Sequence, residues 1–224
     1  MKNPVNNFDI IRDEVLRFND KGQHPTLFYT VEIIRRKKDP GNENFNKNEE
    51  FLDCFMIYSK EDLDKYKDKI IDKCLEYNAR AYINVNASRE VDFLKALVEY
   101  YGNALVNAYE KPGSVNFRSA DYVWRRCVNI VDDDKYFMID CDTEDLNIVS
   151  EVRNILTSVR GASATKGKDG QGEDKVVACI PTLNGYHLVV RHFDTAAYAE
   201  AVKVLGVDAE CKKHALTLLY ANVG

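Results

Sequence analysis

The sequence predicts an α/β (α+β) protein in which an N-terminal α/β module, residues 1–111, is joined by a linker, residues 112–134, to a second module, residues 135–224; the alternative is one compact domain overall. Three observations predict this class. In the second module, strand and helix patterns follow one another in the order β-α-β-β-α-β. In the first module, helical and strand patterns also alternate. Hydrophobic residues make up 45% of the 224 residues, which is enough for one large core or two smaller ones.

The first module contains signals for the beginning and end of several elements. Ser59, with Asp62 three residues later, resembles a capping box, which marks the start of a helix. Ser88 is placed to cap a further long helix, which Pro112 ends. Stretches rich in aromatic and β-branched residues predict the strands. The expected elements are helices over 6–20, 59–77 and 88–111, and strands over 26–34, 51–58 and 80–86.

The second module has clearer element boundaries. Thr143 is placed to cap its first helix, and Asp194 or Thr195 to cap its second. The Asn184-Gly185 pair is a strong signal for a hairpin turn. The order of elements is that of the split βαβ motif. The expected strands cover 135–141, 176–180, 186–190 and 216–220, and the expected helices run from 144 to 160 and from Asp194 to Gly206.

Charge and cysteine content limit the possible partners. A net charge of −5 and a pI near 5.5 argue against binding of nucleic acid by the whole surface. A local basic groove is compatible with this charge, since residues 35–38 read Arg-Arg-Lys-Lys; the run predicts a solvated hairpin tip or a phosphate contact. The six cysteines form no Cys-x-x-Cys pair, so they indicate neither zinc nor a disulfide framework. With no signal peptide and no apolar run of about 18 residues, we expect a soluble, cytoplasmic protein without a membrane partner.

The clearest candidate site is a pair of aspartates at the end of an apolar strand. Asp140 and Asp142 close the run that begins at Tyr136, and their spacing puts both side chains on the same face of a strand. Two neighbouring carboxylates are best tolerated with a cation between them, and Mg²⁺ and Mn²⁺ prefer such oxygen ligands. The alternative is a strand that ends in an acidic, solvated turn.

A histidine is expected close to this pair. His187 begins the strand that follows the hairpin turn, and in the split βαβ order this strand lies beside the strand of Asp140. Two carboxylates and an imidazole together would suit metal-bound phosphate chemistry. His187 is alternatively a structural residue with its hydrogen bonds satisfied.

These motifs resemble those of the archaeo-eukaryotic primase superfamily, the primase-polymerases. The resemblance rests on the apolar strand ending in Asp140-Cys141-Asp142 and on the turn that leads from Thr182 to His187, and it covers residues 135–220. It implies an RRM-like sheet behind an N-terminal α/β module, as in a minimal or divergent member of phage or mobile-element type. It also implies that Asp140 and Asp142 bind catalytic Mg²⁺ or Mn²⁺, and that His187 contacts the phosphates of an incoming nucleotide. The implied partners are a nucleoside triphosphate, single-stranded DNA or RNA, and a helicase or other replication protein.

The sequence also departs from the family pattern. The family motif is usually small-x-His, whereas here Gly185-Tyr186-His187 follows an asparagine. Primase-polymerases have a third carboxylate near the last strand; Asp208 is our candidate for this metal ligand, with Glu210 and Asp194 as alternatives. The position expected for it, just before the last strand, holds His214.

Three basic residues are further candidates for nucleotide binding. Lys166 and Lys168 lie in a Gly-rich loop that could close over a triphosphate, and Arg80 flanks the third strand of the first module. Loops and surface arginines of this kind are also common without a ligand. The loop has no Walker spacing, and the chain has no Gly-x-Gly-x-x-Gly motif.

Three classes of function therefore stay open: a primase-type nucleotidyltransferase, another metal-dependent phosphoryl-transfer enzyme such as a nucleotidyl cyclase, and a non-catalytic module with a vestigial site that binds nucleotide or single-stranded nucleic acid. A cyclase would consume triphosphate without a template, whereas a binding module would retain its function after loss of Asp140. Exposed sheet aromatics such as Tyr136, Phe137 and Tyr186 would favour binding of single strands by stacking.

Overall fold

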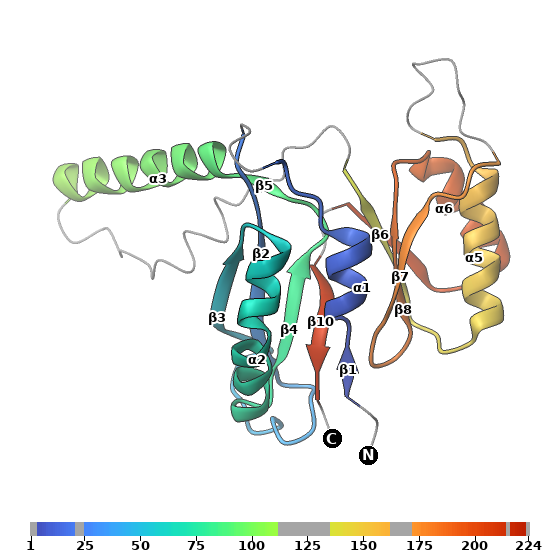
Figure 1. Ribbon diagram of the computed structural model, residues 1–224, viewed down its shortest axis with the longest axis horizontal. Coiled ribbons are helices and arrows are strands. Elements are labelled where there is room, and N and C mark those ends of the chain that lie inside the picture. The colour runs from blue at the N-terminus through green and yellow to red at the C-terminus, as the bar shows by residue number, and fades with distance from the viewer. Residues whose placement is uncertain (1–3, 21–24, 112–134, 162–171, 214–215, 223–224) are drawn as a thin grey trace.

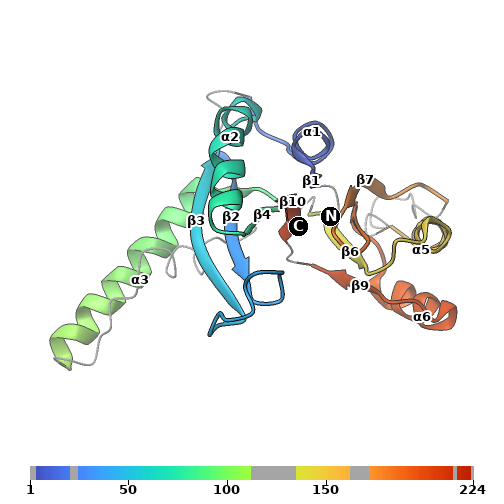
Figure 2. The same ribbon diagram turned by 90° about the horizontal axis from the view of Figure 1, so that it is seen from below.

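The computed structural model of the protein describes residues 4–20, 25–111, 135–161, 172–213 and 216–222. It contains two antiparallel sheets that lie side by side (Figures 1 and 2). Helices α1 and α2 lie against the first sheet, and α5 and α6 lie against the second (Figure 1). The predicted α+β class is confirmed.

The first sheet combines strands from both ends of the chain. Its strand order is β1-β10-β4-β2-β3, and β5 pairs with the beginning of β2. The strands are β1 (Val5–Asn6), β2 (Leu27–Arg36), β3 (Glu49–Ile57), β4 (Arg80–Asn84), β5 (Ser88–Arg89) and β10 (Leu216–Ala221). The helices of this part are α1 (Phe8–Ile10), which continues as the π-helical turn η1 (Ile11–Val15), α2 (Lys60–Glu76) and α3 (Glu90–Glu110).

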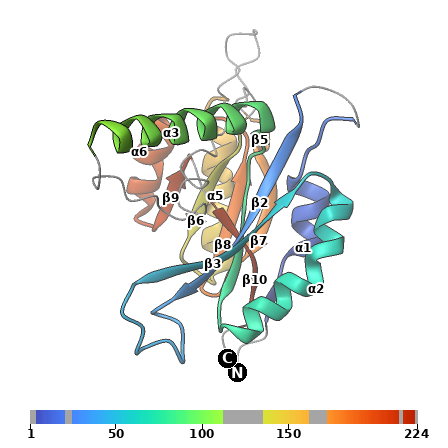
Figure 3. The same ribbon diagram turned by 90° about the vertical axis from the view of Figure 1, so that its left-hand side faces the viewer.

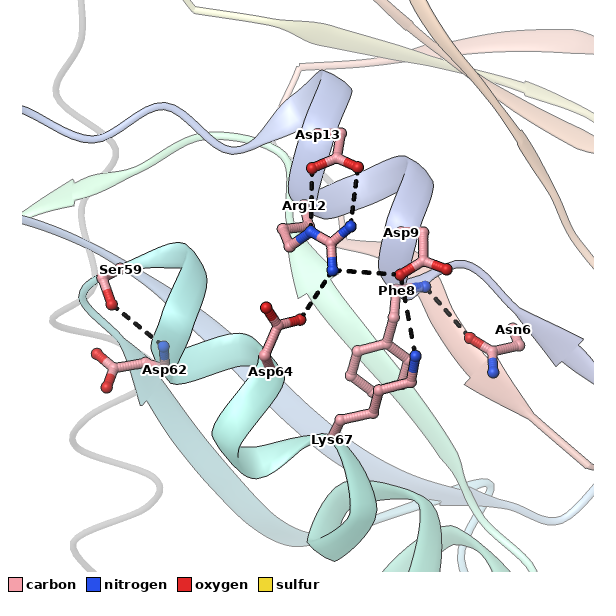
Figure 4. A network of polar contacts seen from close by, with 9 residues as sticks. All are labelled: Asn6, Phe8, Asp9, Arg12, Asp13, Ser59, Asp62, Asp64 and Lys67. Atoms are coloured by element: carbon pink, nitrogen blue, oxygen red, sulfur yellow. Dashed lines mark hydrogen bonds and ion pairs between the residues drawn. The ribbon is translucent and has the colours of Figure 1, made fainter.

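Local sequence explains the packing of α2 on this sheet. Ser59 caps the helix by accepting a hydrogen bond from the amide of Asp62 at 3.1 Å, as the capping-box pattern predicts. The helix buries Leu63, Ile70 and Cys74 against the face of β2 that carries Tyr29, Val31 and Ile33. On its exposed side, α2 is joined to the first helical segment by Arg12, whose guanidinium lies 3.0 Å from Asp64 (Figure 4).

The second sheet has the strand order β7-β8-β6-β9, and all its neighbouring strands are antiparallel. Its core lies under the two helices and includes Ile139, Val152, Leu188 and Tyr198. Asp194 caps α6, and Gly206 ends it with a left-handed backbone at φ +71°, as expected. The elements are β6 (Phe137–Cys141), α5 (Leu146–Ser158), β7 (Val176–Pro181), β8 (Tyr186–Val190), α6 (Thr195–Leu205) and β9 (Ala209–Lys212).

Our prediction for the last strand was wrong about its sheet. The strand expected over 216–220 is β10, which pairs with β4 and β1 in the first sheet. The fourth strand of the second sheet is β9, which we did not predict because its four residues, Ala-Glu-Cys-Lys, contain no β-branched or aromatic side chain.

Two predicted helix caps were also wrong. Ser88 lies in strand β5, and α3 begins after Arg89 without a side-chain cap. Helix α5 is capped by Asp145, which accepts a hydrogen bond from the Asn147 amide, whereas Thr143 accepts one from the Asp145 amide. In both cases the N-cap position lies one or two residues after the polar residue that we expected to cap the helix.

Two buried asparagines join the sheets. The Asn7 side chain donates to the carbonyl of Pro181 in β7 at 2.9 Å and to that of Leu218 in β10 at 2.8 Å. The Asn86 side chain makes a reciprocal pair of bonds to the backbone of Tyr136, at 2.8 and 2.7 Å. One hydrophobic cluster also contains residues of both sheets. These contacts fix the second sheet beside β10.

Helix α3 extends away from both sheets (Figures 1 and 2) and lies on the side that faces the viewer in Figure 3. Near its beginning Phe93 packs on Phe28, with ring centroids 5.5 Å apart. Further along, Val98, Leu105 and Tyr109 are exposed. In the part of the chain that the structure describes, no helix is long and apolar enough to cross a membrane.

Candidate functional site

Asp140 and His187 lie directly opposite each other on β6 and β8, the two central strands of the second sheet. Ile139 and Cys141 face the helices, so Asp140 between them faces away from the helices. The register pairs Asp140 with His187, and His187 Nε2 lies 3.2 Å from Asp140 Oδ1. The other ring nitrogen, Nδ1, lies 3.0 Å from the hydroxyl of Thr217 in β10. The imidazole therefore links the carboxylate to the first sheet.

Lys212 of β9 is a third member of this cluster. Its ammonium donates a short hydrogen bond to Asp140 Oδ2, so both oxygens of Asp140 have a partner. The hydrogen bond from His187 and the charge of Lys212 hold the Asp140 pKa well below its usual value, although partial burial opposes this shift. For Lys212, partial burial lowers the pKa, but the bond to Asp140 and the negative charges of Asp140, Glu210 and Asp142 together raise it more, so the pKa lies above its usual value.

Asp142 lies beyond the end of β6 and is exposed, but it lines the same cavity as Asp140 and His187. The cavity measures about 530 Å³ and lies between the two sheets. Thr182 and Asn184 of the β7–β8 turn also line it. Its volume is within the range of small-molecule sites.

The opposite wall of the cavity belongs to the first sheet and is basic. It contains Arg36, Lys38 and Arg80, together with Tyr82. Arg80 is held by the fully buried carboxylate of Asp39, with Nε 2.9 Å from Oδ2. The structure thus brings Arg80, a candidate chosen from the sequence, into the same cavity as the aspartates.

The Arg36 guanidinium pairs with Glu49 at 3.1 Å and donates to the Tyr82 hydroxyl at 3.2 Å. Lys38 has neither a hydrogen bond nor an ion pair from its side chain to the described residues. The charge of Lys38 is therefore the most available to a ligand on this wall.

Gly185 fixes the position of Asp142 relative to the hairpin. A Cβ atom at this position would lie 2.1 Å from the Cys141 carbonyl oxygen and 2.6 Å from the Thr143 amide. Neither residue of the Asn184-Gly185 pair has a positive φ, so the turn is not the type I′ turn that the pair usually indicates. The Thr182 amide closes this turn by donating to the Gly185 carbonyl at 2.8 Å. Glycine is needed here for close approach of two backbones.

Of the remaining sequence candidates that the structure describes, Glu210 lies beside Asp140, and Asp208 and Asp194 lie elsewhere. Asp208, our candidate third metal ligand, lines a separate cavity between α6 and β9. Asp194 caps α6 through the amides of the following helix. Glu210 lies opposite Asp140 in the β6–β9 register, and its carboxylate is 3.6 Å from Lys212 Nζ. Lys166, Lys168 and His214 lie outside the described residues.

The sequence analysis did not identify Lys212, Thr217 or Lys38 individually. Lys212 could not be found because its strand was missed, and Thr217 because its strand was placed in the wrong sheet. Lys38 belongs to the basic run of residues 35–38, which did indicate a phosphate contact as one possibility.

The site as it stands does not fit the divalent cation implied by the primase resemblance. No group of three or more His, Cys, Asp or Glu side chains within the described ranges is arranged to hold a metal ion. Asp140 is instead neutralised by Lys212 and bonded to His187. Comparison with protein-family models, curated proteins and solved structures found no match for this chain. The primase-type assignment stays a prediction.

Proposed function

We propose that the cavity between the two sheets binds the phosphates of a nucleoside triphosphate, and that the protein is a primase-polymerase-like nucleotidyltransferase acting on nucleic acid. The observation that carries the proposal is the composition of one cavity. Asp140, Asp142 and His187 form one wall, and Arg36, Lys38 and Arg80 form the other. Paired acidic groups opposite a cluster of fixed cations are an arrangement suited to phosphoryl transfer.

The residues that line the cavity would have different roles in binding a nucleotide. Lys38, with no partner among the described residues, would contact phosphate oxygens first, and Arg80 would add a cation whose position is fixed by Asp39. His187 would contact a phosphate oxygen through Nε2 only by giving up its bond to Asp140, while Thr217 holds the ring through Nδ1. The half-buried ring of Tyr82 supplies a surface on which a base could lie.

A basic path could bring single-stranded nucleic acid to this cavity. A second cavity, of about 660 Å³, is lined by Arg36, Lys37, Lys38, Asn48 and Glu49 at the β2–β3 hairpin. It shares Arg36 and Lys38 with the first cavity. Arg35 and Arg36 are paired with glutamates across the hairpin, so Lys37 and Lys38 carry the unbalanced charge. A phosphate backbone would bind to such a track mainly by its charge.

A second candidate function is a nucleotide-binding module without catalysis. It is favoured by the ion pair of Lys212, which neutralises the carboxylate that a nucleotidyltransferase would need for its metal. In this case the cavity would bind the same phosphates, but no bond would form or break.

Calorimetric titration of ATP, with and without Mn²⁺, tests whether the cavity binds nucleotide. We expect wild type to bind, and Lys38→Ala to bind at least about ten-fold more weakly, which corresponds to about 1.4 kcal/mol. Lys47→Ala, an exposed lysine elsewhere in the β2–β3 connection, is the matched control. No binding, or equal binding by Lys38→Ala and wild type, would contradict the proposal.

A primer-synthesis assay on single-stranded DNA then separates the two candidates. The transferase predicts labelled products that disappear in the Asp140→Ala/Asp142→Ala double variant. The binding module predicts ATP binding without products in any variant. Triphosphate consumption in the absence of template would indicate the cyclase-like alternative.

A further inference from the structure

A cation already occupies the space between two carboxylates in this site. Lys212 Nζ donates to Asp140 Oδ2 and lies 3.6 Å from Glu210 Oε2. The two carboxylates come from neighbouring strands, because the register pairs Asp140 with Glu210. Glu210 and Lys212 are two residues apart on β9 and therefore share a face of the sheet. The ammonium thus lies where a metal ion bridging these carboxylates would lie.

Burial makes this ion pair more than a surface contact. The Asp140 side chain is only 19% exposed, and His187 beside it is 12% exposed, whereas Lys212 is 38% exposed. Charges in such a partly dry environment interact more strongly than exposed pairs, and removing one partner leaves the other uncompensated. The Lys212 ammonium is accordingly the counter-ion of Asp140.

A divalent cation could bind Asp140 Oδ2 only by displacing this ammonium. The two cations repel each other at such short range, so binding of the metal must offset the loss of the ion pair between Lys212 and Asp140. We infer that Lys212 competes with divalent cations for Asp140 and Glu210, so that the protein has a fixed cation at the position where the primase resemblance implies a metal. In the wild-type protein, the carboxylates of this site bind Mn²⁺ weakly.

The inference also gives Glu210 a role that the sequence left open. Once the charge of residue 212 is removed, Asp140 and Glu210 form a pair of carboxylates facing one vacant position. Among the described residues, Glu210 forms an ion pair with Lys212 and Asp208 does not, so Asp208 does not take part. This statement concerns metal binding alone, and it does not depend on whether the cavity binds a nucleotide.

The test is to titrate wild type and Lys212→Gln with Mn²⁺ alone. Electron paramagnetic resonance measures the concentration of free Mn²⁺ at each point of the titration. Glutamine keeps a hydrogen-bond donor for Asp140 and removes the charge. We expect Lys212→Gln to bind Mn²⁺ at least about ten-fold more tightly than wild type. Lys213→Gln is the matched control, since it removes the same charge from the next residue, whose ammonium lies 5.9 Å from the Phe137 ring centroid. This control should bind like wild type.

A double variant, Lys212→Gln/Glu210→Gln, should bind Mn²⁺ as weakly as wild type. Tight Mn²⁺ binding by wild type, or no gain in folded Lys212→Gln, would overturn the inference. If Lys212→Gln does not fold, the Mn²⁺ affinities of Lys212→Met and of wild type test the inference instead. Failure of ATP binding in the earlier titration would overturn the proposed function but leave this result unaffected.

Discussion

Replacing Asn7 with alanine should weaken the contact between the two sheets more than any change at neighbouring surface positions. Asn7 is 2% exposed, and its side-chain amide serves the carbonyls of Pro181 and Leu218. A net hydrogen bond contributes about 0.5–1.5 kcal/mol, and a buried polar group left unpaired costs about 1–3 kcal/mol. The bond from the Asn7 amide to the Leu219 carbonyl remains in the variant. We therefore expect the free energy of unfolding to fall by about 2–4 kcal/mol.

Urea unfolding followed by circular dichroism measures this loss, because the midpoint shifts while the slope stays constant if only stability changes. Asn6→Ala is the control: Asn6 is exposed, and its side chain accepts only a 3.4 Å bond from the Phe8 amide. Equal midpoints for Asn7→Ala and Asn6→Ala would refute the reasoning that these two bonds hold β7 and β10 together. The variant should also bind ATP more weakly, since the position of Thr217 beside His187 depends on this junction.

Three further changes test the site. Gly185→Ala should lower the free energy of unfolding by about 2–4 kcal/mol in a urea titration, because its Cβ would overlap the backbone of Cys141, whereas exposed Asn184→Ala should have little effect. Asp140 has a lowered pKa in the folded state, so its contribution is complete above the unfolded value of about 4 and is lost as the pH falls through the folded value. Wild type should therefore lose more stability than Asp140→Asn in urea titrations at decreasing pH below about 5; parallel losses would contradict this. Lys37→Glu should weaken the binding of single-stranded DNA, measured by fluorescence anisotropy at several salt concentrations. The slope of affinity against salt should fall by the equivalent of about 1–2 phosphate contacts. An unchanged slope would exclude the β2–β3 hairpin as the surface that binds the phosphate backbone.

Local patterns predicted most of the individual elements. The cap at Ser59, the cap at Asp194 and the stop at Gly206 lie where the sequence placed them, because each depends on a backbone geometry decided within one helical turn. The convergence of Asp140 and His187 was also predictable, since the split βαβ order makes their strands neighbours.

Long-range pairing was harder to predict. Residues 216–221 have the apolar pattern of a buried strand, and this pattern would suit either sheet. It does not indicate that the partners of β10 are β4 and β1. Strand β9 is short and polar, and its pairing with β6 stabilises it more than its own propensity does. Lys212 lies on this unpredicted strand, so the counter-ion of Asp140 was missed together with it.

Strand β10 reaches the site from the first sheet, and this arrangement bears on how the site can work. Strand β10 follows the second sheet in sequence but hydrogen-bonds between β1 and β4 of the first. It brings Thr217 to His187, while Arg80 arrives on its neighbour β4. The acidic wall and the basic wall therefore depend on the same strand, and a small shift of β10 would change the orientation of the imidazole and the width of the cavity together. A ligand that bridges the two walls would in turn stabilise the junction of the sheets, because it binds only when both walls are in place.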